Sequence, residues 1–253
     1  MPTHKEKEDS NALVIHYLAF RQLLGFMGIS LPVLLIIGSF IFDGGHIETS
    51  ISNFYYTCLR DVFVVILCAV ALFLFAYQGY DKADKWVTNI AGIFGVTVAF
   101  VSTNFKYDIT LPCYKLLSQR TDSIGQLLPL KENCICESYT IIPYPHAEYI
   151  GYIHLTCAAL FFLALAYMSY FQFTKTAGNP SPQKLKRNIL YKTCAIIMAA
   201  CILGLVPCFV SNSLKLFYDS HKLVFWGESI SLWAFGASWL VKGEFIWKDK
   251  LPS

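Results

Sequence analysis

Apolar residues along this chain come in six long blocks separated by shorter polar segments. A bilayer core of about 30 Å requires about 20 apolar residues of a helix, and each block is close to that length. The blocks are too long for ordinary buried strands, so they predict an all-α fold: a single integral membrane bundle of six transmembrane helices. We expect the spans at about residues 20–42, 61–80, 86–103, 148–173, 189–210 and 223–241.

Composition agrees with this pattern. Hydrophobic residues make up 55% of the 253 residues and charged residues 15%, whereas about a quarter of a typical soluble domain is charged. The basic residues are scattered through short connections, which argues against a nucleic-acid partner and leaves membrane lipids as the expected surroundings. The first block lacks a small-residue cleavage site, so we expect it to remain as a span.

The distribution of basic residues predicts the orientation. With six spans, both termini share a side with the connections at 81–85 and 174–188, and that side carries thirteen of the twenty Lys and Arg residues. The excess belongs in the cytoplasm. Both termini are therefore predicted to be cytoplasmic, and the long connection 104–145 is predicted to be extracytoplasmic.

Small residues and prolines predict local features of the helices. Ala91, Gly95 and Ala99 recur every four residues, which places them on one face where a neighbouring helix can approach closely. Pro32 and Pro207 lie inside predicted spans and are expected to kink them.

Ionisable and polar residues gather near the predicted outer ends of the spans. Arg60 and Asp61 open the second span, Asn104 follows the third, and His154 and Glu228 lie just inside the fourth and sixth. Ionisable residues at membrane depth are costly and usually face a cavity or a partner.

The sixth span places Glu228 on one face with Ser231, Phe235 and Ser238, and this face is expected to point into the bundle. We predict an outward-facing polar pocket built on Arg60, Asp61, His154 and Glu228, with Ser231 and Asn104 beside it. The alternative is that Glu228 pairs with His154 or Arg60 simply to hold helices together. The inner half offers mainly Asn89, Gln78 and Ser238, which suggests plain packing there.

Histidines raise the alternative of a zinc centre. His46, His146 and His154 could supply imidazole ligands to a hydrolytic metal site. His146 and His154 are eight residues apart, however, which is too far for one helix to present both to one ion. No metal or other cofactor is therefore predicted, and no catalytic residue is assigned.

Four cysteines fall on the predicted outer side, where disulfides persist. Cys113, Cys134 and Cys136 lie in the long connection, and Cys58 lies in the other outer connection. We prefer a bridge from Cys113 to Cys134 or Cys136. A zinc site on Cys134 and Cys136 is the alternative, although one intervening residue is an unusual ligand spacing.

Two stretches resemble a family of uncharacterised bacterial membrane proteins. They are Ser52–Thr57 followed by Arg60–Phe63, and the closing run that contains Trp226–Glu228, Phe235–Gly236, Trp239 and Lys242–Gly243. In layout this family is similar to the six-span DRAM and Sfk-type proteins with cytoplasmic termini. The resemblance implies the fold and a bacterial inner membrane location, and it implies no catalytic residues.

These observations predict a protein that binds a small ligand or a lipid headgroup in the outward-facing pocket. Arg60 would contact an anionic group, and Glu228 and His154 would orient the ligand or carry protons. Two alternatives remain open: a metal-dependent intramembrane lipid hydrolase and a proton-coupled small-molecule transporter. The pattern carries no prediction of oligomeric state.

Overall fold

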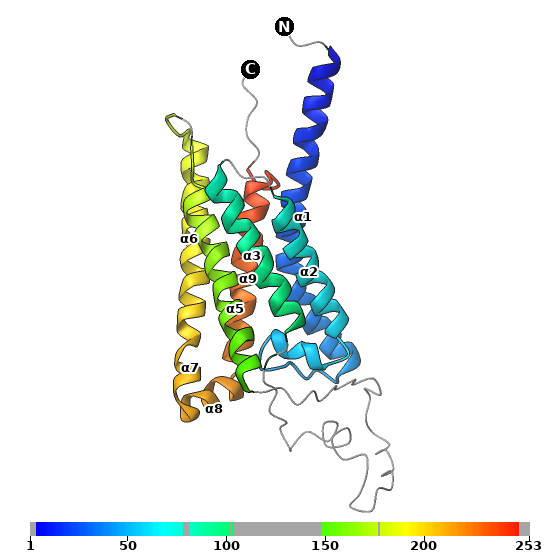
Figure 1. Ribbon diagram of the computed structural model, residues 1–253, viewed down its shortest axis with the longest axis vertical. Coiled ribbons are helices and arrows are strands. Elements are labelled where there is room, and N and C mark those ends of the chain that lie inside the picture. Colours follow the sequence, from blue (N-terminus) through cyan, green and yellow to red (C-terminus); the bar gives the residue numbers. More distant parts are fainter. Residues whose placement is uncertain (1–3, 78–80, 102, 104–147, 177, 248–253) are drawn as a thin grey trace, which may run out of the picture.

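The computed structural model describes residues 4–77, 81–101, 103, 148–176 and 178–247, and within these ranges all regular structure is helical (Figure 1). The long helices are α1 (His4–Phe42), α2 (Arg60–Ala76), α3 (Lys82–Phe100), α5 (Glu148–Tyr167), α6 (Pro182–Leu205) and α9 (Leu223–Lys242). The short elements are the 3₁₀ helix η1 (Ser52–Tyr56), the π-helical turn η2 (Met168–Gln172), α7 (Pro207–Val210) and α8 (Asn212–Ser220).

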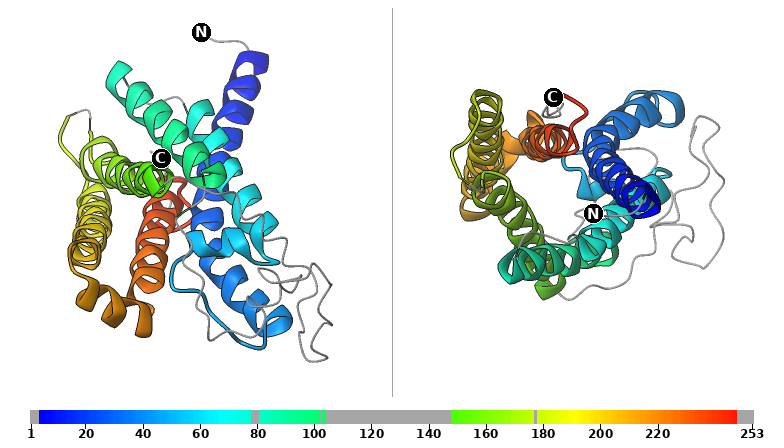
Figure 2. Two further views of the ribbon diagram at one scale, coloured as in Figure 1. Left: turned by 60° about the horizontal axis from the view of Figure 1, so that its bottom comes forward. Right: turned by 90° about the horizontal axis from the view of Figure 1, so that it is seen from above.

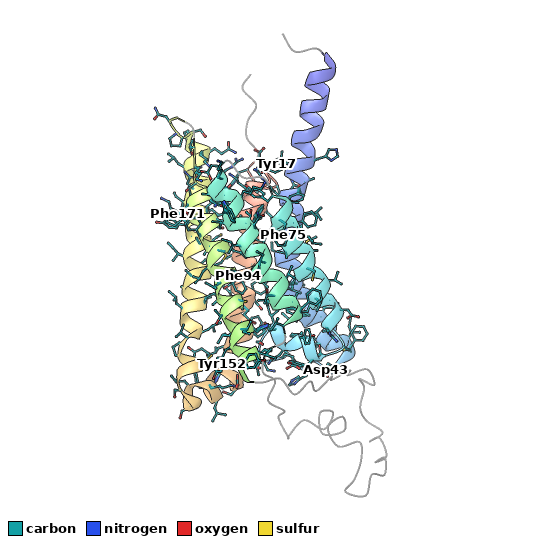
Figure 3. All side chains as sticks on the ribbon, in the orientation of Figure 1. Tyr17, Asp43, Phe75, Phe94, Tyr152 and Phe171 are labelled. Atoms are coloured by element: carbon teal, nitrogen blue, oxygen red, sulfur yellow. The ribbon has the colours of Figure 1, made fainter. Side chains whose placement is uncertain are left out.

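The six long helices form a closed ring. Each one packs mainly against two others, in the order α1, α2, α3, α5, α6, α9 and back to α1, and the view along the bundle shows this order directly (Figure 2). In the orientation of Figure 1, α1 begins and α9 ends at the upper end of the bundle, while η1 and α8 lie at the lower end. Figure 3 places Tyr17 at the upper end and Asp43 and Tyr152 at the lower end. We use "upper end" and "lower end" in this sense.

Local sequence explains where two of the helices begin. The Asp81 carboxylate accepts a hydrogen bond from the Asp84 amide (2.9 Å) and caps α3. The Ser181 hydroxyl accepts one from the Lys184 amide (3.1 Å), and Pro182 occupies the first position of α6, where its missing N–H costs nothing.

Three described segments are long and apolar enough to cross a bilayer, which supports the prediction of a helical membrane protein: His16–Phe42, Tyr149–Gln172 and Pro182–Leu205. The predicted spans at 148–173 and 223–241 agree with α5 plus η2 and with α9 to within one residue. The other four differ by three or more residues at one or both ends, because α1 begins at His4, α2 ends at Ala76, α3 covers Lys82–Phe100 and α6 covers Pro182–Leu205. The connection 104–145 lies outside the described residues.

Apolar and polar side chains are distributed as expected for a protein in lipid. Large apolar side chains project outward from every long helix, including Leu72 (64% exposed) and Ile189 (67%). Charged side chains such as Arg21, Arg187 and Lys242 are instead less than 9% exposed. Because water would favour the opposite arrangement, the outer surface suits a hydrocarbon solvent.

Close helix contacts use small residues, as predicted. Ala91, Gly95 and Ala99 are buried on one face of α3, and Gly95 faces Ala71 of α2 and Phe161 of α5. A second close contact joins α1 to α9, where a Cβ added to Gly236 would lie 2.6 Å from the Gly25 carbonyl oxygen. Pro207 interrupts the helix as expected, since α6 ends at Leu205 and α7 begins at the proline, whereas α1 remains helical through Pro32.

Candidate functional site

Glu228 lies at the lower end of α9 and binds main-chain amides. Its Oε2 accepts a hydrogen bond from the Ile51 amide at 2.6 Å, and the Ser52 amide also donates to the carboxylate. These amides stand at the start of η1, where a helix favours a negative charge. Glu228 therefore holds the start of η1 against the lower end of α9.

Further contacts hold the same connection, which we call the lower segment (residues 43–59). The Phe225 amide donates to the Thr49 carbonyl (2.9 Å), and the Phe54 and Phe225 rings lie 6.1 Å apart. Ile51, Phe54 and Leu59 are each at most 5% exposed. The lower segment is thus packed onto α9 around the Glu228 carboxylate.

His154 joins α5 to the end of α3. Its side chain is 5% exposed, and its Nδ1 lies 2.5 Å from the Val101 carbonyl oxygen. Because a carbonyl can only accept, Nδ1 carries the proton. The Tyr56 hydroxyl donates to the nearby Thr103 carbonyl (2.5 Å), so this end of α3 is held from both the lower segment and α5.

Arg60 and Asp61 lie at the start of α2 and have separate surroundings. Arg60 donates to the Tyr55 hydroxyl (2.9 Å) and its guanidinium lies 4.4 Å from the centre of the same ring. Asp61 is exposed. The Ser231 hydroxyl donates within its own helix to the Gly227 carbonyl (2.8 Å), and Asn104 lies outside the described residues.

The predicted site residues therefore share the lower end without bonding to one another. Among the described residues, no hydrogen bond or ion pair joins any two of Arg60, Asp61, His154 and Glu228. The proposed pairing of Glu228 with His154 or Arg60 is absent from this set of contacts. Instead, Glu228 and His154 each bind the backbone of a segment distant in sequence.

The predicted metal ligands and bridging cysteines are only partly described. His46 is half-buried between Asp43 and Lys222; burial, and then Lys222, hold the pKa of its imidazole below the usual value, while Asp43 opposes this shift. Within the described ranges, no three His, Cys, Asp or Glu side chains gather as metal ligands. Cys58 is half-buried in the lower segment; Cys113, Cys134, Cys136 and His146 lie outside the described residues.

The upper end carries a cluster that the sequence pattern did not reveal. A row of rings crosses the bundle: Tyr17 stacks on Tyr77 (5.9 Å between centroids), Tyr77 meets Trp239 (5.1 Å), Trp239 meets Phe173 (5.0 Å), and Phe173 meets Tyr191 (5.5 Å). The last four are at most 2% exposed. We call this row, with the cations that border it, the aromatic layer.

Three cations lie against these rings. The Arg21 guanidinium is 4.1 Å from the centre of Tyr17, Lys242 Nζ is 5.3 Å from that of Phe173, and Lys184 Nζ is 5.6 Å from that of Tyr191. These distances are typical of cation–π contacts. Arg187, also buried, donates to the Trp247 carbonyl.

Gln172 is buried next to this layer. It is 2% exposed, and neither its Nε2 nor its Oε1 has a hydrogen-bond partner among the described residues. The upper half is therefore not the plain packing that the sequence suggested. A sequence pattern could have indicated this cluster. Near the upper ends of three helices, a basic residue lies about one helical turn from an aromatic residue, at positions 17/21, 187/191 and 239/242.

Comparisons with known proteins add no assignment to this geometry: no protein-family description, curated protein or solved structure matches the chain.

Proposed function

We propose that all six long helices span a membrane. They form one ring with apolar side chains outside and charged side chains inside. Even α2, with 17 residues, extends about 26 Å at 1.5 Å per residue, close to the thickness of a bilayer core. The excess of basic residues at the upper end favours a cytoplasmic location for that end and both termini, and the family resemblance favours a bacterial inner membrane.

We further propose that the protein binds a small polar ligand or a lipid headgroup at its lower, outward-facing end. The observation that carries this proposal is the Glu228 carboxylate, which lies at the junction of α9 with the lower segment and accepts hydrogen bonds from the Ile51 and Ser52 amides. A carboxylate that fastens a connection over the end of a bundle can orient a cationic group of a ligand. Arg60, whose guanidinium is fixed against Tyr55, can contact an anionic group.

Proton-coupled transport is a second candidate, favoured by the same contact. Neutralising Glu228 would remove the negative charge that holds the Ile51 amide, and hydrogen bonds to a charged group are stronger than those to a neutral one. Proton binding would then loosen the lower segment. In liposomes, this candidate predicts substrate flux that follows an imposed pH gradient and that is lost in Glu228→Gln.

The binding proposal is tested with phosphoethanolamine, a soluble headgroup that combines an ammonium group with a phosphate. Purified protein in a neutral detergent should melt at a higher temperature as phosphoethanolamine is added. Glu228→Gln, which keeps a carbonyl oxygen as acceptor, should lose most of this stabilisation. Glu244→Gln, an acid replaced at the opposite end, is the matched control and should retain it.

Arg60→Gln provides an independent variant, because Arg60 is partly exposed and its hydrogen bond goes to Tyr55, only five residues earlier in the chain. It should weaken the response without lowering the melting temperature of the ligand-free protein by more than a few degrees. A parent protein that does not respond to phosphoethanolamine, or equal responses in the parent and both variants, would reject the lower end as its binding site.

A further inference from the structure

The aromatic layer is assembled from residue pairs about one turn apart on different helices. Tyr17 and Arg21 share a face of α1, Arg187 and Tyr191 share a face of α6, and Trp239 and Lys242 share a face of α9. Residues three or four apart in a helix lie on the same side. The segment at η2 adds a fourth pair, Ser169 and Phe173. Four segments that are distant in sequence therefore each place a polar or charged group and a ring at the same level of the bundle.

The cations of this layer are held in position. Arg21 Nη1 donates to the Lys242 carbonyl (3.4 Å), and Lys184 Nζ donates to the Phe173 carbonyl (2.7 Å). The rings beneath them restrict their side chains further. Cations that are already ordered lose less conformational freedom when they bind an anion, so the arrangement favours anion binding.

Charged side chains gather at this level. The described ones include the cations Arg21, Lys175, Lys184, Arg187 and Lys242 and the acids Asp81, Asp84 and Glu244. Lys175 bonds to both Asp81 (2.8 Å) and Asp84 (2.6 Å). Arg21, Lys184 and Lys242 lie instead against the rings.

Gln172 points independently to a ligand. It belongs to η2, a π-helical turn, and such turns are frequent at functional sites. It lies between Ser169, whose hydroxyl donates to Ser238 (2.9 Å), and Phe173 in the ring row. A buried carboxamide without partners is costly. Because both its donor and its acceptor lack partners, it suits a ligand that offers an acceptor and a hydroxyl donor.

We propose that the aromatic layer binds a phosphate ester that carries a free hydroxyl, with Arg21 and Lys242 bonding the phosphate and Gln172 bonding both groups. The ligand chemistry fits the headgroup of a glycerol or inositol phospholipid in the adjacent leaflet, or a soluble polyol phosphate. A surface depression lined by Pro182, Gln183, Lys186 and Trp247 lies at the same end of the bundle.

The decisive variant is Gln172→Met, which keeps the side-chain volume and the net charge and removes both unpartnered atoms. Full-length protein, stripped of lipid in a neutral detergent, is titrated with phosphatidylglycerol, with phosphatidylcholine and, separately, with glycerol 3-phosphate. Bound copies are counted by native mass spectrometry and melting temperatures are recorded. Lys82→Gln, an exposed cation replaced at the same end, is the matched control.

Phosphatidylglycerol should bind and stabilise the parent more than phosphatidylcholine does. Gln172→Met should weaken this binding about tenfold, the effect of losing a hydrogen bond to a charged group, and Lys82→Gln should leave it unchanged. Protection by glycerol 3-phosphate would identify a soluble ligand, and protection by phosphatidylglycerol alone would identify a lipid. The proposal fails if neither phosphate ester protects the parent, or if Gln172→Met melts higher and binds phosphatidylglycerol as tightly as the parent.

Discussion

His46 lies in the lower segment, half-buried, with Asp43 and Lys222 nearby. Burial, and next the positive charge of Lys222, lower the pKa of this imidazole from its usual value of about 6.5. The folded protein therefore holds His46 neutral under conditions in which the unfolded chain begins to bind a proton there.

This shift has a defined sign. The stability contributed by neutral His46 is complete above about pH 6.5 and is lost as the pH falls through the lowered folded-state value, because the unfolded chain then binds more protons. We expect the melting temperature to fall from pH 7 to about pH 5, and His46→Gln to fall less over the same range. The check is a series of thermal melts in detergent for both proteins.

His221, an exposed histidine at the same end, supplies the control for this series. The assignment to His46 is contradicted if His221→Gln reduces the pH dependence as much as His46→Gln does.

The helices α1 and α9 approach each other through glycines. Gly25 would place a Cβ 2.8 Å from the Gly236 carbonyl oxygen, and Gly236 would place one 2.6 Å from the Gly25 carbonyl oxygen. Both obstacles are main-chain atoms, which cannot rotate away. The contact between α1 and α9 therefore depends on the absence of side chains at these positions.

Gly236→Ala should separate α1 from α9 and destabilise the bundle by about 1–3 kcal/mol, the usual cost of overpacking a core. Gly204→Ala is the matched change in α6, where an added Cβ meets nothing within 4 Å. It should be neutral or gain up to about 1 kcal/mol from helix propensity. Thermal melts of both variants test this, and equal effects at the two positions would contradict the described α1–α9 contact.

Helix positions could be predicted well from the sequence along the apolar runs. The sixth run predicts a helix at 223–241 and α9 covers Leu223–Lys242, because the length of the apolar run matches the length of the helix. Prediction was poorer beyond the apolar runs. The polar first turns of α6 were missed although Ser181 and Pro182 form a capping signal, and α8 was missed because it is short and only partly apolar.

The candidate sites show a different limit. The sequence singles out Glu228 as a site residue, but the structure shows that its partner is the amide of Ile51, and a main-chain donor cannot be recognised from residue types. Arg21 and Lys242 were counted as charges at the ends of the spans, so their burial in the aromatic layer was not foreseen. Which rings would cover them depends on how four distant segments pack.

The two ends of the six-helix ring are covered by different structures. At the lower end the Glu228 carboxylate fastens the lower segment, and at the upper end rings and cations fill the layer between α1 and α6. Charged and polar groups thus occur at both ends, with rings and cations concentrated at the upper one. The two proposed binding sites face opposite sides of the membrane only if all six helices cross it. The topology is therefore the central claim.

The location of the C-terminus separates the alternatives. If only α1, α5 and α6 crossed the membrane, three crossings would put the two termini on opposite sides, whereas six crossings put them on the same side.

The only Asn-X-Ser/Thr triplet of the sequence, Asn179-Pro180-Ser181, has proline in the middle and is not a glycosylation acceptor. A glycosylation tag can therefore be appended after Ser253, or inserted after Gly44 as a positive control, and followed in microsomes. Six spans with cytoplasmic termini predict modification after Gly44 and none at the C-terminus; modification of the C-terminal tag would contradict the account.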